Sequence, residues 1–440
     1  MRPSLAHPGA ALAGRAAQPV GARSGSRARG LTPARFVGAI LAICLLLQRF
    51  ALPFGSLELS VAAPLGLLLA VWGLAVGILT IDRRRAACFL GLCAMALIAT
   101  AVHVNVPVAI APRISLNSLA YWLIITAFAI LRLREPMPEV QFFRLVSAWL
   151  TVVAAAGVLA FVGQFVGLTL FSFSHLVPAR LLIEDQYAVV IPLKGSGILR
   201  ANGFFLVEPS VFSQFMAVGI IIEYLTFRRP LQMLLYVAGL LVAVSGTGWL
   251  VLAAFLISFL PTMRLQRLLQ VLALVAVCGA AIVAASFILP TITAGLFDRA
   301  GELSQPGSSG YARFVTPFMA LGRVLHDAPW TLATGLGPGA SQNLLLPFKY
   351  TLNTPVKIVM EYGIFGLSMY LGVILTARRS ARQSALLVPL MVLLMFTGGY
   401  QEFPPILLSV LLIATVALLR DGETLRQAPL ARNLHVQARQ

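Results

Sequence analysis

Leu145–Phe171 reads LVSAWLTVVAAAGVLAFVGQFVGLTLF, an apolar run without a single charged side chain. A helix that crosses the hydrocarbon core of a bilayer needs about 20 such residues. This stretch therefore predicts a membrane-spanning helix. Similar runs recur along the chain from residue 36 to residue 420.

The composition of the whole chain agrees with a membrane protein. Of its 440 residues, 59% are hydrophobic and 11% are charged, and the mean hydropathy is +0.89. A soluble protein carries roughly a quarter charged residues, so the composition excludes a chain made of soluble domains. We expect an all-α, polytopic integral membrane protein with about twelve transmembrane helices, near 36–53, 61–81, 86–105, 114–131, 145–171, 208–227, 231–245, 247–263, 269–289, 355–376, 384–399 and 402–420.

One region leaves the number of spans open. Residues 231–263 are divided by Ser245-Gly246-Thr247-Gly248, so they could form two short helices, a broken helix or one long tilted helix. Two separate spans place the arginines that follow, among them Arg264 and Arg378, on the cytoplasmic side, as the positive-inside rule demands. We therefore favour twelve spans over eleven.

The net charge of +18 has two possible meanings. In a soluble protein it would suggest binding to nucleic acid. Here most of the basic residues fall in the tails and short turns that the twelve-span topology places inside, so the charge indicates cytoplasmic anchoring and no nucleic-acid partner. We expect a disordered basic cytoplasmic tail at 1–35, a transmembrane domain at 36–420 and a cytoplasmic tail at 421–440.

Two long loops, at about 172–207 and 290–354, then lie together on the same outer face of the membrane, the second between helices 9 and 10. Loops of this length tend to be functional. Their basic residues suit a phosphate or diphosphate group, because the planar guanidinium of Arg can bind phosphate through two hydrogen bonds. The alternative is loop solvation with local ion pairs. The candidates in the second loop are Arg299, Arg313 and Arg323.

The segment Arg200-Ala-Asn-Gly-Phe-Phe-Leu-Val-Glu208-Pro209-Ser210 places an Arg and a Glu at the outer mouth of a span. Glu208-Pro209-Ser210 could simply begin the helix, since proline is tolerated in a first turn. A carboxylate at the water–bilayer boundary could also accept a proton from a sugar hydroxyl. Arg200 could then hold a leaving diphosphate.

A second polar segment opens the span after the long loop. Asn353 precedes Pro355 and could cap the helix, and Lys357 and Glu361 share one helix face. This is either a capped helix with one ion pair or a polar stripe entering the membrane beside a site. Upstream, Gly335-Leu-Gly337-Pro-Gly339 permits a tight turn and close backbone approach to a ligand.

Metal and cofactor chemistry find no support in the sequence. Four cysteines in apolar runs and five scattered histidines do not form a metal-ligand pattern. No HExxH, GxSxG or Walker motif is present. We therefore expect neither a metal nor a cofactor.

These segments, in this order, resemble the bacterial O-antigen ligase and polysaccharide polymerase family. Its pattern combines an Arg and Gly-Phe segment before a span, a Ser-Arg-Thr/Ser-Gly turn and a large outer loop with an internal Arg. The loop ends in Gly-x-Gly, and Asn with Glu-x-Gly-x-x-Gly follows it. The matching residues here are Arg200, Gly203, Phe204, Glu208, Ser245, Gly248, Arg313, Gly335, Gly337, Gly339, Asn353, Glu361, Gly363 and Gly366.

Two positions depart from the family pattern. Gly246 stands where the family usually has Arg, and Leu352 stands where ligases typically carry His. The second departure favours the polymerase side of the family, for an exopolysaccharide, over a ligase that transfers finished glycan to lipid A core or protein. A flippase or exporter of lipid-linked sugars is the alternative of another class, although the polar residues concentrate on one face.

The resemblance implies a GT-C-like fold and a metal-independent, inverting glycosyltransferase. Its donor and acceptor would be oligosaccharides on undecaprenyl diphosphate, and a chain-length regulator and export machinery would be partners. Arg200 and Arg313 would hold the diphosphate with help from Lys357, and Glu208 would be the general base. Asn353, Glu361, Gly337, Gly339, Arg299 and Arg323 would bind and order the substrate.

Overall fold

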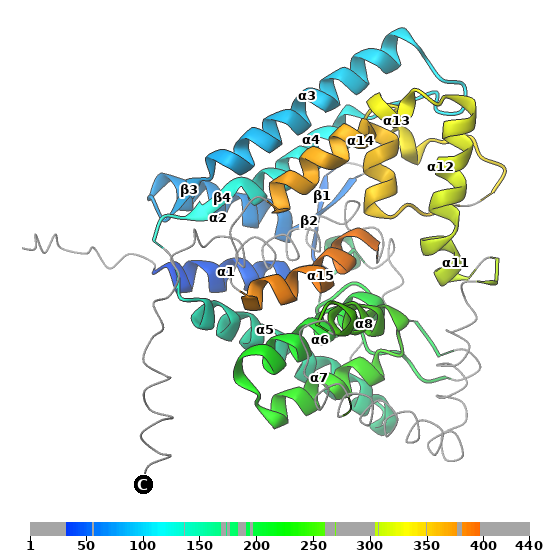
Figure 1. The fold of residues 1–440 in the computed structure, drawn as a ribbon. Coiled ribbons are helices and arrows are strands. Elements are labelled where there is room, and N and C mark those ends of the chain that lie inside the picture. Colours follow the sequence, from blue (N-terminus) through cyan, green and yellow to red (C-terminus); the bar gives the residue numbers. More distant parts are fainter. Residues whose placement is uncertain are drawn as a thin grey trace, which may run out of the picture. The chain divides into compact units, whose positions relative to one another are not determined.

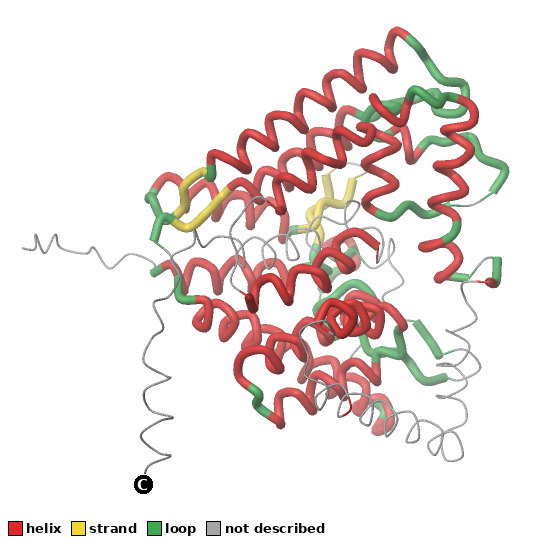
Figure 2. Tube along the Cα trace, in the orientation of Figure 1, coloured by secondary structure: helices red, strands yellow, loops and turns green. Residues whose placement is uncertain are grey.

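The computed structural model describes residues 32–54, 57–135, 137–168, 173, 177–183, 191–193, 197–259, 269, 304–306, 308–348, 350–375 and 381–396. Residues 1–31 of the tail predicted at 1–35, the tail predicted at 421–440, the span predicted at 269–289 except its first residue, the span predicted at 402–420, and Arg299 lie outside these residues. Residues 33–35, predicted as the end of the disordered tail, belong to a helix instead. The described part is mainly helical (Figures 1 and 2).

The longer helices coincide with apolar runs of the sequence, and short strands and helices lie between them. In chain order, the elements are α1 (Pro33–Leu46), β1 (Ala51–Phe54), β2 (Leu57–Ser60), α2 (Ala62–Ala75), β3 (Leu79–Ile81), α3 (Arg83–Asn105), α4 (Leu116–Ala127), η1 (Phe128–Ile130), β4 (Leu131–Leu133), α5 (Glu139–Gly163), η2 (Gln164–Val166), η3 (Ala179–Leu181), α6 (Pro209–Ile222), η4 (Glu223–Phe227), α7 (Pro230–Val242), α8 (Gly246–Phe259), α11 (Ser309–Phe314), α12 (Thr316–Asp327), α13 (Thr331–Thr334), η7 (Ala340–Gln342), α14 (Thr354–Leu375) and α15 (Ala381–Phe396).

Four helices among the described residues are long and apolar enough to cross a membrane: Arg83–Asn105, Glu139–Val166, Pro209–Phe227 and Thr354–Leu375. Six further apolar helices are shorter, for example Pro33–Leu46 and Ala62–Ala75. The prediction of a largely helical membrane protein is therefore supported. Most of the predicted spans are realised as helices that are shorter than the apolar runs, because turns and short strands take up their ends.

Helix α6 is the centre of one helical group and is buried along nearly its whole length. It runs antiparallel to α5, since Ser147 near the start of α5 bonds Glu223 after the end of α6, while Gly157 further along α5 faces Phe212 near the start of α6. Glycine is required at position 157 because a Cβ there would lie 2.5 Å from the Phe212 ring.

Helices α7 and α8 are separate helices of opposite direction. Helix α8 runs parallel to α6, because the Gly248 amide bonds Ser213 Oγ at 3.2 Å and the Phe255 ring meets the Tyr224 ring 5.9 Å away. Helix α7 runs antiparallel to α6, because its Gly239 faces Met216 and its Tyr236 faces Gly219. The structure thus shows a reversal of the chain between the two helices, not one long tilted helix.

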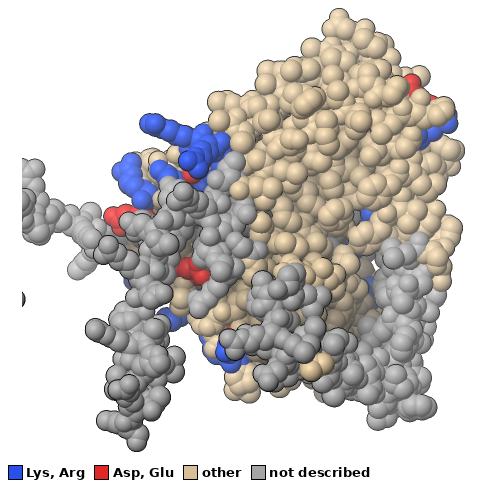
Figure 3. Space-filling view, viewed as in Figure 1, with Lys and Arg blue, Asp and Glu red and all other residues tan. Residues whose placement is uncertain are grey.

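Two short antiparallel strand pairs were not predicted. Strand β1 pairs with β2, and β3 pairs with β4 with Thr80 opposite Arg132. The β3–β4 pair provides hydrogen-bond partners for the backbone N–H and C=O groups where the chain leaves α2 and η1. It also joins the arginines at the start of α3 to Arg132 and Arg134, and Figure 3 shows Lys and Arg gathered over this end of the molecule.

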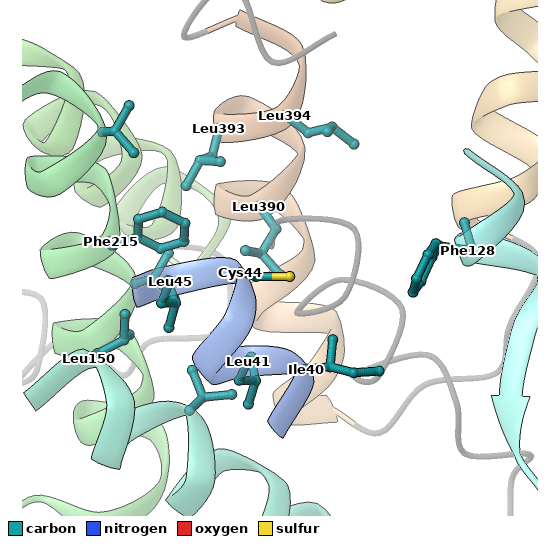
Figure 4. Close-up of a cluster of buried hydrophobic side chains, with 14 of the residues drawn as sticks. Ile40, Leu41, Cys44, Leu45, Phe128, Leu150, Phe215, Leu390, Leu393 and Leu394 are labelled. Carbon is teal, nitrogen blue, oxygen red and sulfur yellow. The ribbon is translucent and has the colours of Figure 1, made fainter. Parts of the chain in front are cut away.

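A cluster of apolar side chains holds α1 against its neighbours. Leu45 of α1, Leu150 of α5, Phe215 of α6 and Leu393 of α15 all belong to this core and are almost fully buried (Figure 4). Helix α14 packs against α3 over much of its length, with Gly372 against Cys88. The packing leaves the polar residues of interest at the start of α6, on α11 and at the start of α14.

Candidate functional site

The structure brings Glu208 and Arg313 together, although 105 positions separate them in the sequence. Glu208 is the residue that precedes α6, and Pro209 occupies the first turn of the helix, as the sequence predicted. One carboxylate oxygen of Glu208 lies 3.5 Å from Arg313 Nη2 and accepts a hydrogen bond of 2.7 Å from Ser210 Oγ. Both charged side chains are partly exposed, at 26% and 22%. The pair is therefore accessible from solvent.

Arg200 is buried at the end of α7. Its Nε donates to the Ala243 carbonyl at 3.1 Å, and the neighbouring Ala201 amide donates to the Val242 carbonyl at 3.0 Å. A cation is favourable at a helix C-terminus, where carbonyl groups lack partners within the helix. Arg200 thus joins the loop before α6 to the turn between α7 and α8.

That turn contacts the start of α6. Thr247 Oγ1 donates to the Ser210 carbonyl at 3.1 Å and lies 3.2 Å from Ser213 Oγ. Gly248 has no room for a side chain, because a Cβ would collide with the Ser213 backbone. The Ser245–Gly248 motif and the Arg200–Ser210 motif therefore form one structural unit around the N-terminus of α6.

A buried arginine that the sequence reasoning missed lies beside this unit. Arg49 follows α1, is fully buried, and donates from Nη1 to the Phe204 carbonyl at 2.6 Å. Its guanidinium carbon lies 5.0 Å from the centre of the Phe173 ring. Only a weak sequence signal points to Arg49, since a charged residue at the end of an apolar run is common at membrane interfaces.

The N-terminus of α14 carries the second group of candidates. Asn353 is fully buried and its Oδ1 accepts from the Val356 amide at 3.1 Å, so it caps the helix as the sequence suggested. Its Nδ2 has no hydrogen-bond partner among the described residues. A buried amide donor without a partner is costly, and a ligand oxygen could satisfy it.

Lys357 and Glu361 follow on the same helix and are both buried. The Ser341 hydroxyl donates to Glu361 Oε1. Two ionisable residues inside an apolar helix are expensive to bury and usually face a cavity or a partner. Ser341 belongs to η7, so Glu361 ties α14 to the end of the long loop.

Helix α14 is broken at Gly363, where φ is 71°. The carbonyls of Met360 and Glu361 accept instead from the amides of Leu336 (2.7 Å) and Gly337 (3.1 Å). The bend in α14 is visible in Figure 1. The glycine-rich loop therefore replaces the missing hydrogen bonds of the broken helix.

Glycine is required on both sides of this contact. A Cβ at Gly363 would collide with the Ala333 carbonyl, and a Cβ at Gly335 would collide with that of Glu361. Gly337 and Gly339 have φ of 97° and 68° and pack closely against Ile114 and Ser115. Each of the predicted substrate-binding glycines thus also has a packing function.

A hydrogen bond connects the two groups of candidates. Thr316 Oγ1, at the start of α12, accepts from the Thr351 amide at 3.2 Å. Arg313 lies three residues before Thr316, and Asn353 lies two residues after Thr351. Helices α11 and α12 therefore link the Glu208–Arg313 pair to the start of α14.

Arg323 is placed differently from Arg313. It is 56% exposed on α12 and forms an ion pair of 3.3 Å with Asp327, which also contacts His326. None of its contacts among the described residues joins it to Glu208. Its predicted part in substrate binding therefore has no support in these contacts.

A second polar network, also missed, lies at the other end of α6. Glu223 is fully buried and forms an ion pair with Arg229, whose Nη2 donates to Ser147 Oγ at 2.8 Å. Ser147 in turn donates to Glu223 at 2.6 Å, and the Tyr236 hydroxyl donates to the Ser147 carbonyl. Hydrogen bonding to Glu223 and its charge raise the pKa of the Arg229 guanidinium. These hydrogen bonds and the ion pair connect α5, the end of α6 and α7.

No group of three His, Cys, Asp or Glu side chains that could hold a metal ion occurs among the described residues. No protein-family model matches the sequence, and no curated protein matches it either. The arrangement of the side chains themselves therefore carries the functional argument.

Proposed function

We propose that this chain is a bacterial polysaccharide polymerase of the O-antigen ligase and polymerase type. It would join oligosaccharides carried on undecaprenyl diphosphate by inverting glycosyl transfer. The observation that supports this most is the Glu208–Arg313 contact, because it places a carboxylate and a guanidinium at one partly exposed position. Both residues come from motifs in which the family resemblance expects a base and a diphosphate ligand.

Glycosyl transfer requires two things of the site. The negative charge of the leaving group must be stabilised, and the acceptor hydroxyl must lose its proton. In the proposed reaction, an acceptor hydroxyl oxygen attacks the anomeric carbon of the donor sugar, and the bond from that carbon to the diphosphate oxygen breaks. The hydroxyl proton passes to the Glu208 carboxylate. Undecaprenyl diphosphate leaves, and its negative charge is stabilised by Arg313.

The contact with Glu208 occupies one nitrogen of Arg313, and a guanidinium carries five N–H donors. The remaining donors could hold the diphosphate while the contact keeps the carboxylate in place. Arg200 would act mainly by fixing the segment that carries Glu208, since its Nε is engaged with Ala243. It would contribute positive charge to the leaving group as well.

The start of α14 would bind the remainder of the diphosphate. Broken membrane helices direct the positive end of a half-helix dipole toward anionic groups. Lys357 adds a charge one turn from Asn353, whose Nδ2 is a buried donor. Glu361 would hold the site in shape through Ser341 and the glycine-rich loop.

The proposal includes the finer membrane topology. The chain would cross the inner membrane about twelve times in a GT-C-like fold, with both termini in the cytoplasm. The opposite directions of α7 and α8 support the twelve-span count over eleven. The loops at 172–207 and 290–354 would form a periplasmic active site, served by a chain-length regulator and export machinery.

The test is polymerisation by the purified protein supplied only with lipid-linked repeat units. Wild-type protein is expected to produce long chains, and Arg313→Ala is expected to abolish them. Arg113→Ala, which removes an exposed arginine before α4, is the matched control and should behave as wild type.

Three outcomes would overturn the proposal. Normal chains from Arg313→Ala, at a normal protein level, would reject the site. A knockout that strands long chains on undecaprenyl diphosphate would identify a ligase. Transport of lipid-linked sugars in vesicles, without polymerisation, would identify a flippase.

A further inference from the structure

We infer that Arg49 is a positioning residue for the site: it clamps the turn at Gly203–Phe204 and thereby fixes Glu208 beside Arg313. The catalytic part of this inference rests on the function proposed above. The clamp itself rests only on contacts within the structure.

The turn that Arg49 holds has an unfavourable backbone. Gly203 and Phe204 have φ of 72° and 61°, and a positive φ is a genuine outlier for a bulky residue such as Phe. Such a conformation persists only where the surroundings over-determine it. The chain reverses here and reaches Glu208 four residues later.

Both backbone groups of Phe204 are held by polar side chains. The Phe204 amide donates to Asn202 Oδ1 at 2.9 Å, and the Phe204 carbonyl accepts from Arg49 Nη1 at 2.6 Å. Asn202 and Arg49 are both fully buried. The Asn202 contact is local, whereas Arg49 is 155 positions away from Phe204 in the sequence, so the Arg49 contact ties the turn to the end of α1.

Aromatic packing completes the clamp. The Phe173 ring lies 4.3 Å from the Phe204 ring and 5.0 Å from the Arg49 guanidinium carbon. Arg49 also accepts, through its carbonyl, a hydrogen bond of 2.9 Å from the Ile183 amide. Arginine suits this position because its planar group can donate to a carbonyl and contact an aromatic face together.

The turn also packs closely against two helices. A Cβ at Gly203 would lie 2.6 Å from the Phe212 ring on α6 and 2.9 Å from Val153 on α5. The turn is thus inserted between the two helices, immediately before the segment that ends at Glu208. Loss of the clamp would let this segment relax and shift the carboxylate relative to Arg313.

The experiment compares Arg49→Gln, Arg49→Lys, Phe204→Gly and the double variant Arg49→Gln/Phe204→Gly in detergent. Arg180→Gln, an exposed arginine in the same outer loop, is the control. Two quantities are measured: hydrogen exchange of amides 200–208, and kcat and KM for polymerisation of lipid-linked repeat units. Helix α3 serves as the internal reference for exchange.

We expect Arg49→Gln to accelerate exchange at 200–208 but not in α3, and to lower kcat by about 10²-fold with little change in KM, the scale of a misplacement of about 1 Å. Arg49→Lys should fall between wild type and Arg49→Gln. Phe204→Gly alone should lower kcat less than Arg49→Gln does, because it removes the ring packed against Phe173 but relieves the positive φ. In the double variant it should restore kcat about tenfold, because glycine adopts a positive φ without a clamp.

Unchanged exchange and kcat in Arg49→Gln would overturn the inference. Acceleration in α3 as well, with no rescue by Phe204→Gly, would show a merely structural arginine and would also overturn it. A wild-type protein without polymerase activity would reject the proposed function instead, and the exchange measurements would still decide on the clamp.

Discussion

At the scale of single residues, the proposed chemistry depends on how Glu208 is used. Its carboxylate accepts a hydrogen bond from Ser210 and contacts Arg313. An ionised carboxylate can accept a proton, whereas an amide cannot. Substitution of Glu208 therefore tests whether activity depends on the negative charge of the side chain or on its size.

We expect Glu208→Gln to lower the rate of polymerisation by about 10²- to 10⁴-fold, the usual contribution of a general base. Glu208→Asp should retain more activity, because it keeps a carboxylate at the cost of reach. The measurement is kcat with purified protein and lipid-linked repeat units. A Glu208→Gln variant within threefold of wild type would exclude Glu208 as the base.

The second residue-scale prediction concerns the buried carboxylate of Glu223. We expect Arg229→Gln to lower the free energy of unfolding by about 2–3 kcal/mol, because it leaves Glu223 buried without its cation. The effect stays below that of a fully buried pair, since Arg229 is 40% exposed.

Thermal unfolding in detergent measures this effect. The double variant Glu223→Gln/Arg229→Gln should recover part of the lost stability, because it removes the uncompensated charge. A double variant less stable than Arg229→Gln would argue that Glu223 is held by Ser147 and not by the arginine.

At the scale of elements, the break in α14 explains why glycines occur both within this helix and in the loop that precedes it. Gly363 interrupts the helix, and Gly335 and Gly337 let the loop backbone reach the freed carbonyls. The sequence reasoning read the loop glycines as an approach to a ligand. It could not predict that their partner is a helix backbone 24 residues downstream, because backbone pairing leaves no side-chain signature.

We expect Gly363→Ala to be severely destabilising, by about 3 kcal/mol or more, because it combines a positive φ with a collision against the Ala333 carbonyl. Gly322→Ala is the matched control. Gly322 lies on α12 with open space around it and should gain up to about 1 kcal/mol from the better helix former. Melting temperature in detergent distinguishes the two, and equal melting temperatures would refute the role of the break.

At the scale of the whole molecule, hydropathy predicted where helices occur better than where they end. The apolar run at 61–81 becomes a helix only to Ala75, because Gly77 adopts a φ of 76° and a strand follows. The run at 208–227 begins at Pro209 as expected, since proline marks a first turn clearly. Hydropathy alone therefore does not predict the turns that end helices inside apolar stretches of the sequence.

The candidate site was predictable in composition but not in its contacts. Glu208, Arg313 and Asn353 were found from local motifs. Their mutual placement follows from how α11 and α12 fold back on α6 and α14, and no local pattern encodes this. Arg49 was missed for the same reason, since its partner Phe204 is 155 positions away.

The topology gives a prediction for the molecule as a whole. In a background without native cysteines, Arg180→Cys and Gln305→Cys should react with a membrane-impermeant maleimide in intact cells. Arg84→Cys and Arg228→Cys should react only after permeabilisation, because the positive-inside rule places them in the cytoplasm. All four positions are exposed in the structure. Labelling of Arg228→Cys from outside would reverse the proposed orientation.

The pairing of the glycine-rich loop with the broken helix also constrains the order of assembly during synthesis. The amides of Leu336 and Gly337 reach their backbone acceptors only after Met360 and Glu361 have been synthesised. The Gly335–Gly339 segment would therefore reach its final form late in synthesis, and a chain that stops before Met360 would leave this segment accessible to proteases.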